Sequence, residues 1–235
     1  MEDKDDFYSK TYGFNDIVYS NAPKEKQDSI WGSYVDGLNL LTEEDAIQLS
    51  LITRRVSKEQ YKKETNYPLK NDNYEVYREE FNELTNNAYK NGKSNFRTSK
   101  YFTFRTFAES PVRANSQLET VKQSFAKELS TAGVRLYSLS GQDRLEAIAS
   151  ITRPGKFIRP VFNDLKVLKA AGRPLSTKDI LAPDSINPKL MGINVGEQFG
   201  RVLYVRDYQY SMDDRMVKEL TENGHESDIA IHAQP

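Results

Sequence analysis

The chain has 235 residues, with 33 Lys and Arg against 34 Asp and Glu, and it contains no cysteine. This balance gives no general electrostatic reason to expect nucleic acid or anionic lipid as the partner. The missing cysteine excludes disulfides, thiol catalysis and Cys-ligated metal centres, and it fits a reducing compartment. No apolar run approaches the ~20 residues of a membrane-spanning helix. The acidic N-terminal residues "MEDKDDFYSK" do not resemble a secretory signal.

The chain opens with a predicted strand, helix and strand. Residues 7–19 mix aromatic and β-branched side chains, which is typical of a strand. Residues 23–41 predict an amphipathic helix, and Trp31 is interpreted as a core residue on its apolar face. Residues 46–52, "AIQLSLI", alternate as a half-buried strand does. Four apolar residues of the helix recur at helical spacing: Ile30, Tyr34, Leu38 and Leu41.

An insertion of about residues 57–95 is predicted next. Residues 57–73 are polar and show no periodicity. They are followed by a second apolar stripe, set amid glutamates, which predicts a long surface helix that ends near Gly92. The stripe consists of Tyr74, Tyr77, Phe81, Leu84 and Ala88.

The clearest strand and helix of the chain come after the insertion. "KYFTFRTF" predicts a strand, and the helix that follows has Ser110 at its N-cap, Pro111 in its first turn and Gly133 at its end. A strand, "VRLYSLS", and a short helix, "GQDRLEAIASIT", complete the pattern. Without the insertion, residues 1–152 predict an α+β domain: a ferredoxin-like split βαβ with helices on one face of an antiparallel sheet.

A basic connector rich in Pro and Gly is predicted over residues 153–177. Between residues 153 and 174 it has six cations and a single acid, Asp164. A solvated connector is the simpler interpretation, and contact with phosphate or an acidic partner is the alternative. The candidate partner-binding residues are Lys156, Arg159, Lys166, Lys169 and Arg173.

Residues 178–235 predict a partial second unit that belongs to the same domain. "KLMGINV" and "RVLYVRDY" resemble paired strands, "SMDDRMVKELTENG" a helix and "DIAIHA" a final strand. The unit therefore has the order β-β-α-β.

Three groups of residues resemble catalytic or metal-binding motifs. The glycines of "GINVGEQFG" miss the spacing of a P-loop by one residue, and a strand follows where a P-loop needs a helix. We therefore interpret this segment as a hairpin turn. Asp213 and Asp214 follow Ser211 at a helix start, which is typical of capping. His225 and His232 fit no metal-ligand spacing, and His232 is expected on the outer face of a strand. We expect no catalytic, cofactor-binding or metal-binding residue in this chain.

The aromatic strand leaves two interpretations open. Phe102 and Phe104 share one face, and burial in the core is the default for such residues. A ferredoxin-like sheet can instead present aromatic side chains to the bases of RNA. With the basic connector, this second interpretation makes a single-stranded nucleic-acid-binding module the alternative function.

The order of several segments resembles a known family. They are "FYSKTYGFNDIVY", "KYFTFRTFAESPVRANSQLETVKQSFAKELSTAGVRLYSLSGQDRLEAI", "STKDILAP", "GRVLYVRDYQYSMDDRMVKELTE" and "DIAIHAQP". Together, from about Phe7 to Pro235, they resemble the N-terminal domain of the large cytoplasmic ATPase of type IV secretion and conjugative DNA-transfer systems, in its Gram-positive form. The turn from Asp179 to Pro183 and the junction from Ala108 to Ser110 are the most recognisable parts.

The resemblance implies that the function of this chain is not catalytic. Family members carry their Walker motifs in a C-terminal RecA-like domain, so ATP and Mg²⁺ are expected there. The resemblance implies a cytoplasmic docking and assembly domain, peripheral at the inner face of the cell membrane. Inner-membrane and cytoplasmic channel components are the implied partners, and self-association is implied for the parent. Sheet edges, the connector and the 57–95 insertion are the surfaces expected to meet partners.

Overall fold

A computed structural model of the chain describes residues 6–17, 19, 21–91, 95–154, 181–204, 219 and 226–233. Two sheets and five helices make up this part of the chain. The elements, in chain order, are β1 (Asp6–Phe14), α1 (Lys24–Leu38), β2 (Ala46–Arg55), α2 (Lys58–Thr65), α3 (Glu75–Lys90), β3 (Phe96–Ala108), α4 (Pro111–Thr131), β4 (Leu136–Ser138), α5 (Gly141–Thr152), β5 (Ile186–Lys189), β6 (Gly192–Val195), β7 (Gln198–Gly200) and β8 (Ser227–Ala233).

The larger sheet confirms the predicted α+β fold. Its strand order is β4-β1-β3-β2-β8, and all its pairs are antiparallel. The first four strands have the arrangement of a split βαβ, in which β3 lies between the two strands that α1 connects. The last strand, β8, pairs with β2 from Thr53↔Ser227 to Ile47↔Ala233 and so extends the sheet at that edge.

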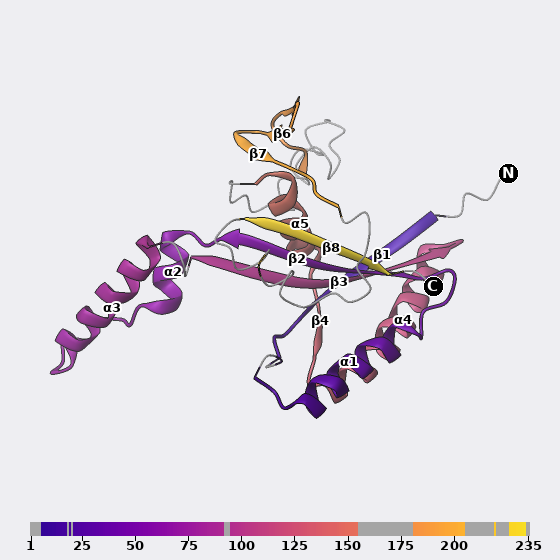
Figure 1. Cartoon of the computed structure of the whole chain (residues 1–235), viewed down its shortest axis with the longest axis horizontal. Coiled ribbons are helices and arrows are strands. Elements are labelled where there is room, and N and C mark those ends of the chain that lie inside the picture. The colour runs from indigo at the N-terminus through magenta and orange to yellow at the C-terminus, as the bar shows by residue number, and fades with distance from the viewer. Residues whose placement is uncertain are drawn as a thin grey trace.

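The core lies between one face of this sheet and the helices α1 and α4 (Figure 1). Alternate residues of a strand point to opposite faces, so Tyr12, Phe102 and Phe104 reach the helices together. All three are at most 4% exposed, and Phe125 of α4 is fully buried against them. The residues that the sequence places on the α1 face, Ile30, Tyr34, Leu38 and Leu41, pack against this core as predicted.

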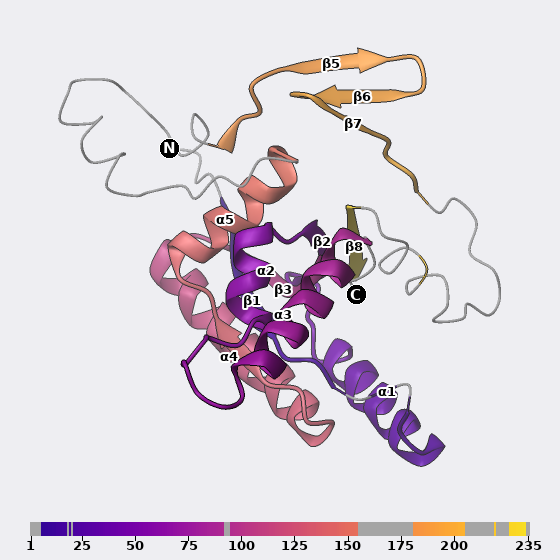
Figure 2. The same cartoon turned by 90° about the vertical axis from the view of Figure 1, so that its left-hand side faces the viewer.

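The fifth helix lies on the opposite face of the sheet from α4. Lys10 and Tyr12 of β1 contact Glu119 of α4, whereas Ser9, which has the opposite parity along the strand, contacts Arg144 of α5. Arg144 Nη1 donates to the Ser9 carbonyl at 2.8 Å and Nη2 to its hydroxyl at 2.7 Å. The structure thus adds a third layer to the fold, which Figure 2 shows as α5 and α4 on either side of the strands.

The long helix α4 begins and ends where the sequence predicts. Ser110 Oγ accepts a hydrogen bond from the Arg113 amide at 3.3 Å, and Pro111 occupies the first turn. Gly133 follows the helix with a φ of +84°, a conformation that favours glycine. Local capping therefore fixes both ends of this helix.

The insertion is a helical hairpin of α2 and α3 that projects beyond one end of the sheet (Figure 1). Its second helix was predicted, but α2 lies within the stretch that showed no periodicity. Ser57 caps α2 by accepting a hydrogen bond from the Gln60 amide at 3.2 Å. Tyr61 is the only apolar residue in the helix, KEQYKKET, so no apolar period marks α2 in the sequence.

The smaller sheet corrects the predicted pairing in the second unit. Its order is β5-β6-β7, so β6 pairs with β5 on one side and with β7 on the other. Residues 201–204 are not in a strand, because the turn after β6 brings Gln198–Gly200 opposite it instead. The final predicted strand is confirmed as β8. The domain boundaries at residues 152 and 177 remain predictions.

Trp31 is the clearest misassignment of the core. The sequence places it on the apolar face of α1, but its side chain is 62% exposed. The side of α1 that faces α4 is instead formed by buried Ser33 and Gly37, with Tyr34 beside them. Trp31 borders this face and contacts the Tyr34 ring at a centroid distance of 5.8 Å.

We expect the contact between β1 and α4 to make stability depend on pH through Glu119. Lys10 Nζ donates to Glu119 Oε1 at 2.5 Å and Tyr12 Oη donates at 3.0 Å. The bond from Lys10, above all, holds the pKa of Glu119 below its ordinary value of 4.5. The ionised carboxylate therefore stabilises the fold above pH 4.5, and this contribution disappears as the pH falls through the lowered pKa.

The Glu119→Gln variant tests this dependence. The difference in unfolding free energy between it and the unaltered chain should be larger at about pH 7 than at about pH 3. Urea unfolding followed by fluorescence at both pH values measures the difference. An equal difference at both would show that the carboxylate charge does not stabilise this contact.

Candidate functional site

The glycine segment of residues 192–200 forms a hairpin, as predicted. β6 and β7 are joined through Gly196, whose φ is +60°, and the last ladder pair is Val195↔Gln198. Positive φ at the first of two turn residues is the backbone that glycine supplies in a two-residue hairpin. The segment is followed by residues 201–204 without helix, so it lacks the strand-to-helix context of a phosphate-binding loop.

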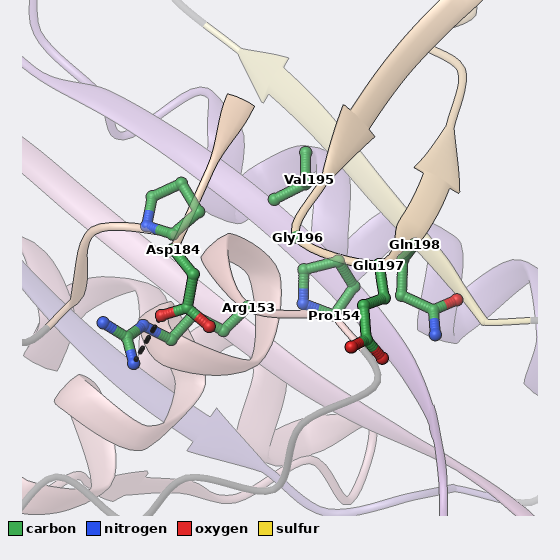
Figure 3. Close-up of a pocket in the computed structure, with 8 residues that line it drawn as sticks. Arg153, Pro154, Asp184, Val195, Gly196, Glu197 and Gln198 are labelled. Atoms are coloured by element: carbon green, nitrogen blue, oxygen red, sulfur yellow. Dashed lines mark ion pairs between the residues drawn. The ribbon is translucent and has the colours of Figure 1, made fainter. Parts of the chain in front are cut away.

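A small pocket adjoins this turn (Figure 3). Arg153 lies beside Asp184 there, at 3.7 Å, and Arg153 Nε donates to the Ala182 carbonyl at 2.8 Å. The pocket encloses about 30 Å³, which holds one or two water molecules. Ligand pockets have volumes of ~300–1,000 Å³. We therefore assign the pocket to packing of the hairpin against the end of α5.

Phe102 and Phe104 of β3 belong to the core. Phe102 is 4% exposed and Phe104 is fully buried, and both rings contact Phe125 at 5.2 and 5.4 Å between centroids. The core interpretation is thus confirmed for these two residues. In this structure these two residues are not available to stack on bases, so the nucleic-acid alternative would need other side chains and stays a prediction.

Most of the other candidates lie outside the described residues. These include the five connector cations, Lys156, Arg159, Lys166, Lys169 and Arg173, together with Asp213, Asp214 and His225. His232 is described: it is exposed on β8, as predicted. Within the described ranges, no group of three or more His, Asp or Glu side chains could hold a metal ion.

Among the helices that the structure describes, α3 carries the most extensive exposed apolar surface. We call it the α3 stripe, and it is the apolar periodicity that the sequence predicts, left open to solvent. Tyr74 is 66% exposed, Tyr77 67%, Phe81 42% and Leu84 62%. Ala88 completes the stripe. Single exposed apolar residues are common, but a contiguous row of large ones marks a surface that meets a partner.

The inner side of the hairpin is held by polar contacts instead. The Asn82 side chain accepts from the Tyr67 amide at 2.8 Å and donates to the Tyr67 carbonyl at 2.9 Å. Thr85 donates to the Asn66 side chain at 3.1 Å. Tyr61 and Tyr89 pack with their ring centroids 5.0 Å apart. These contacts turn the α3 stripe away from α2.

The hairpin is attached to the sheet at its base. Tyr89 Oη donates to the Val56 carbonyl at 3.0 Å, just beyond the end of β2. Arg97 of β3 forms an ion pair with Glu64 of α2. Asn95, which is fully buried, donates to the Tyr89 carbonyl at 3.2 Å. The stripe is therefore presented by helices that are fixed to the domain.

Fold and surface together define an α+β domain with a ferredoxin-like sheet and a projecting helical hairpin that offers an apolar stripe. No family model matches the chain, and no curated protein matches it significantly. Within the described residues, no helix combines the length and apolarity needed to cross a membrane.

Proposed function

We propose that the chain is a non-catalytic docking and assembly domain of a conjugative type IV secretion ATPase. Two observations support the proposal. The order of the sequence segments resembles the N-terminal domain of those ATPases, and the α2–α3 hairpin carries exposed large apolar side chains away from the sheet (Figure 1). The second observation carries the proposal, because an apolar surface on a fixed projecting element is what a docking domain needs.

In this function the domain would hold the motor at the inner face of the cell membrane by contacts with channel components. The parent ATPase would supply ATP hydrolysis from its C-terminal domain, and the present domain would supply position. The sheet builds a rigid base, since its core is closed by α1 and α4, and the insertion provides the contact surface.

Competition in donor cells tests the proposal. The isolated chain, expressed in about tenfold excess over the parent ATPase, should occupy its docking positions and lower the DNA-transfer frequency about tenfold by mass action. Growth of the cells should not change. A chain with a disrupted core, Phe125→Ala, is the control for expression alone. Transfer at the normal frequency, despite the excess of folded chain, would refute the docking function.

A further inference from the structure

We propose that the α3 stripe binds a basic amphipathic helix of a partner protein, in the manner of a two-helix coiled coil. The inference rests on the proposed docking function and names the chemistry of the partner. The stripe residues Tyr74, Tyr77, Phe81, Leu84 and Ala88 follow one another at intervals of three and four residues. This is the spacing of positions a and d in a heptad repeat, whose row faces a second helix.

The N-terminal half of the stripe contains a pocket that could take an apolar side chain. Tyr67, Tyr74, Tyr77, Arg78 and Phe81 line a shallow pocket there. The rings of Tyr67 and Phe81 pack with centroids 5.1 Å apart. Arg78 is fixed by two hydrogen bonds to Asp72, at 2.6 and 2.7 Å. An apolar side chain of a docked helix would contact ring faces on most sides.

One glutamate, Glu80, borders the stripe on its solvent side, and Glu83 and Glu79 lie further round the helix from it. Glu80 lies one helical turn from both Tyr77 and Leu84, at spacings of three and four residues. Glu83 lies at the same two spacings from Glu80 and Glu79, so like charges are neighbours on the side of α3 behind this border. None of the three forms an ion pair with any residue in the described part of the chain.

This border selects the partner. Lys or Arg beside the apolar row of a docked helix would pair with Glu80 and offset its repulsion with Glu83. The Arg78 charge is already matched by Asp72, so it does not offset the acidic border. A second copy of the chain is disfavoured, because an antiparallel pair of stripes would set one Glu80 against the other. Anionic lipid is disfavoured by the same charges.

A designed peptide tests the inference without knowledge of the natural partner. The probe has about 21 residues, or three heptads, with Leu at positions a and d and Lys at e and g. A matched peptide has Glu in place of Lys. Fluorescence anisotropy should show saturable binding of the Lys peptide to the chain, and binding of the Glu peptide at least about tenfold weaker.

Two variants and a control locate the site. Leu84→Asp should weaken binding of the Lys peptide at least about tenfold, because it places a charge in the apolar row. Glu80→Lys combined with Glu83→Lys should reverse the preference between the peptides. Val112→Asp is the control, since Val112 is an apolar residue of α4 with 82% exposure. Circular dichroism and thermal unfolding confirm that each variant is folded.

Several outcomes would overturn the inference: no binding of the Lys peptide, equal affinity for both peptides, or binding that survives Leu84→Asp. Self-association that Leu84→Asp abolishes, without peptide binding, would assign the stripe to a second copy instead. The competition experiment in donor cells separates this inference from the docking function. Lowered transfer without peptide binding refutes only the basic helix, and peptide binding without lowered transfer refutes only the docking function.

Discussion

Replacing Phe125 with alanine is expected to lower the free energy of unfolding by about 3–5 kcal/mol. Phe125 is fully buried, and its ring meets three other rings: Tyr34 of α1 at 6.4 Å, Phe102 at 5.2 Å and Phe104 at 5.4 Å between centroids. Its removal takes contacts from both helices and from the central strand. The neighbouring elements cannot close the cavity without separating from one another.

Chemical denaturation followed by circular dichroism measures this loss. The control is Val112→Ala in the same helix, which should change the unfolding free energy by less than about 0.5 kcal/mol, because Val112 is exposed. A loss below about 1 kcal/mol for Phe125→Ala would contradict the structure. It would mean that the layer of α1 and α4 is not packed on the sheet as described.

The same ring explains a glycine that the sequence leaves unexplained. Gly37 is within α1, where glycine weakens a helix. A Cβ added there would lie 2.8 Å from the Phe125 ring, so the close approach of α1 to α4 excludes any larger residue. Helical periodicity predicts both helices, but it contains no information about how closely they approach.

Much of the fold could be predicted because its signals are local. The cap at Ser110, the stop at Gly133 and the alternation of β2 each depend on neighbours in the sequence. The position of α5 on the second face and the pairing of β8 with β2 could not. They depend on contacts between distant residues, such as Arg144 with Ser9.

For the α3 stripe too, the sequence predicts what depends on local pattern and not what depends on distant contacts. The sequence predicts that Tyr77, Phe81 and Leu84 share one face of a helix, because periodicity defines faces. It does not predict that this face is left open, since burial depends on what packs against it. Trp31 shows the converse error, because an apolar residue on a helix with a buried face was assumed to lie on that face. The two hydrogen bonds between the Asn82 side chain and the Tyr67 backbone turn the stripe outward, and no sequence pattern predicts them.

The second large loss of unfolding free energy is expected on replacement of Arg54, whose side chain links the C-terminal strand to the rest of the sheet. Its guanidinium donates to the carbonyls of Ser150, Thr53 and Ser227 at 2.9, 2.8 and 3.3 Å. Nη2 also pairs with Asp228 at 2.6 Å. The side chain is only 18% exposed. Through these bonds it links β8, the end of β2 and the end of α5.

Arg54→Ala is expected to lower the free energy of unfolding by about 2–3 kcal/mol, because hydrogen bonds from a charged donor are lost and carbonyls are left without it. The loss should be concentrated in β8, which is an edge strand and has no strand on its outer side among the described residues. Hydrogen exchange should therefore accelerate at the amides of residues 227–233 well before those of α4.

Arg55→Ala is the matched control, because the Arg55 side chain is exposed and only its backbone amide contacts Glu226, at 3.3 Å. It should leave exchange in β8 nearly unchanged. If Arg54→Ala accelerates exchange equally in β8 and α4, the strand unfolds with the core and is not a separately fastened element. Faster exchange confined to residues 227–233 would establish that the split βαβ holds without its fifth strand, since the ladders that join β1, β2, β3 and β4 to one another do not involve β8.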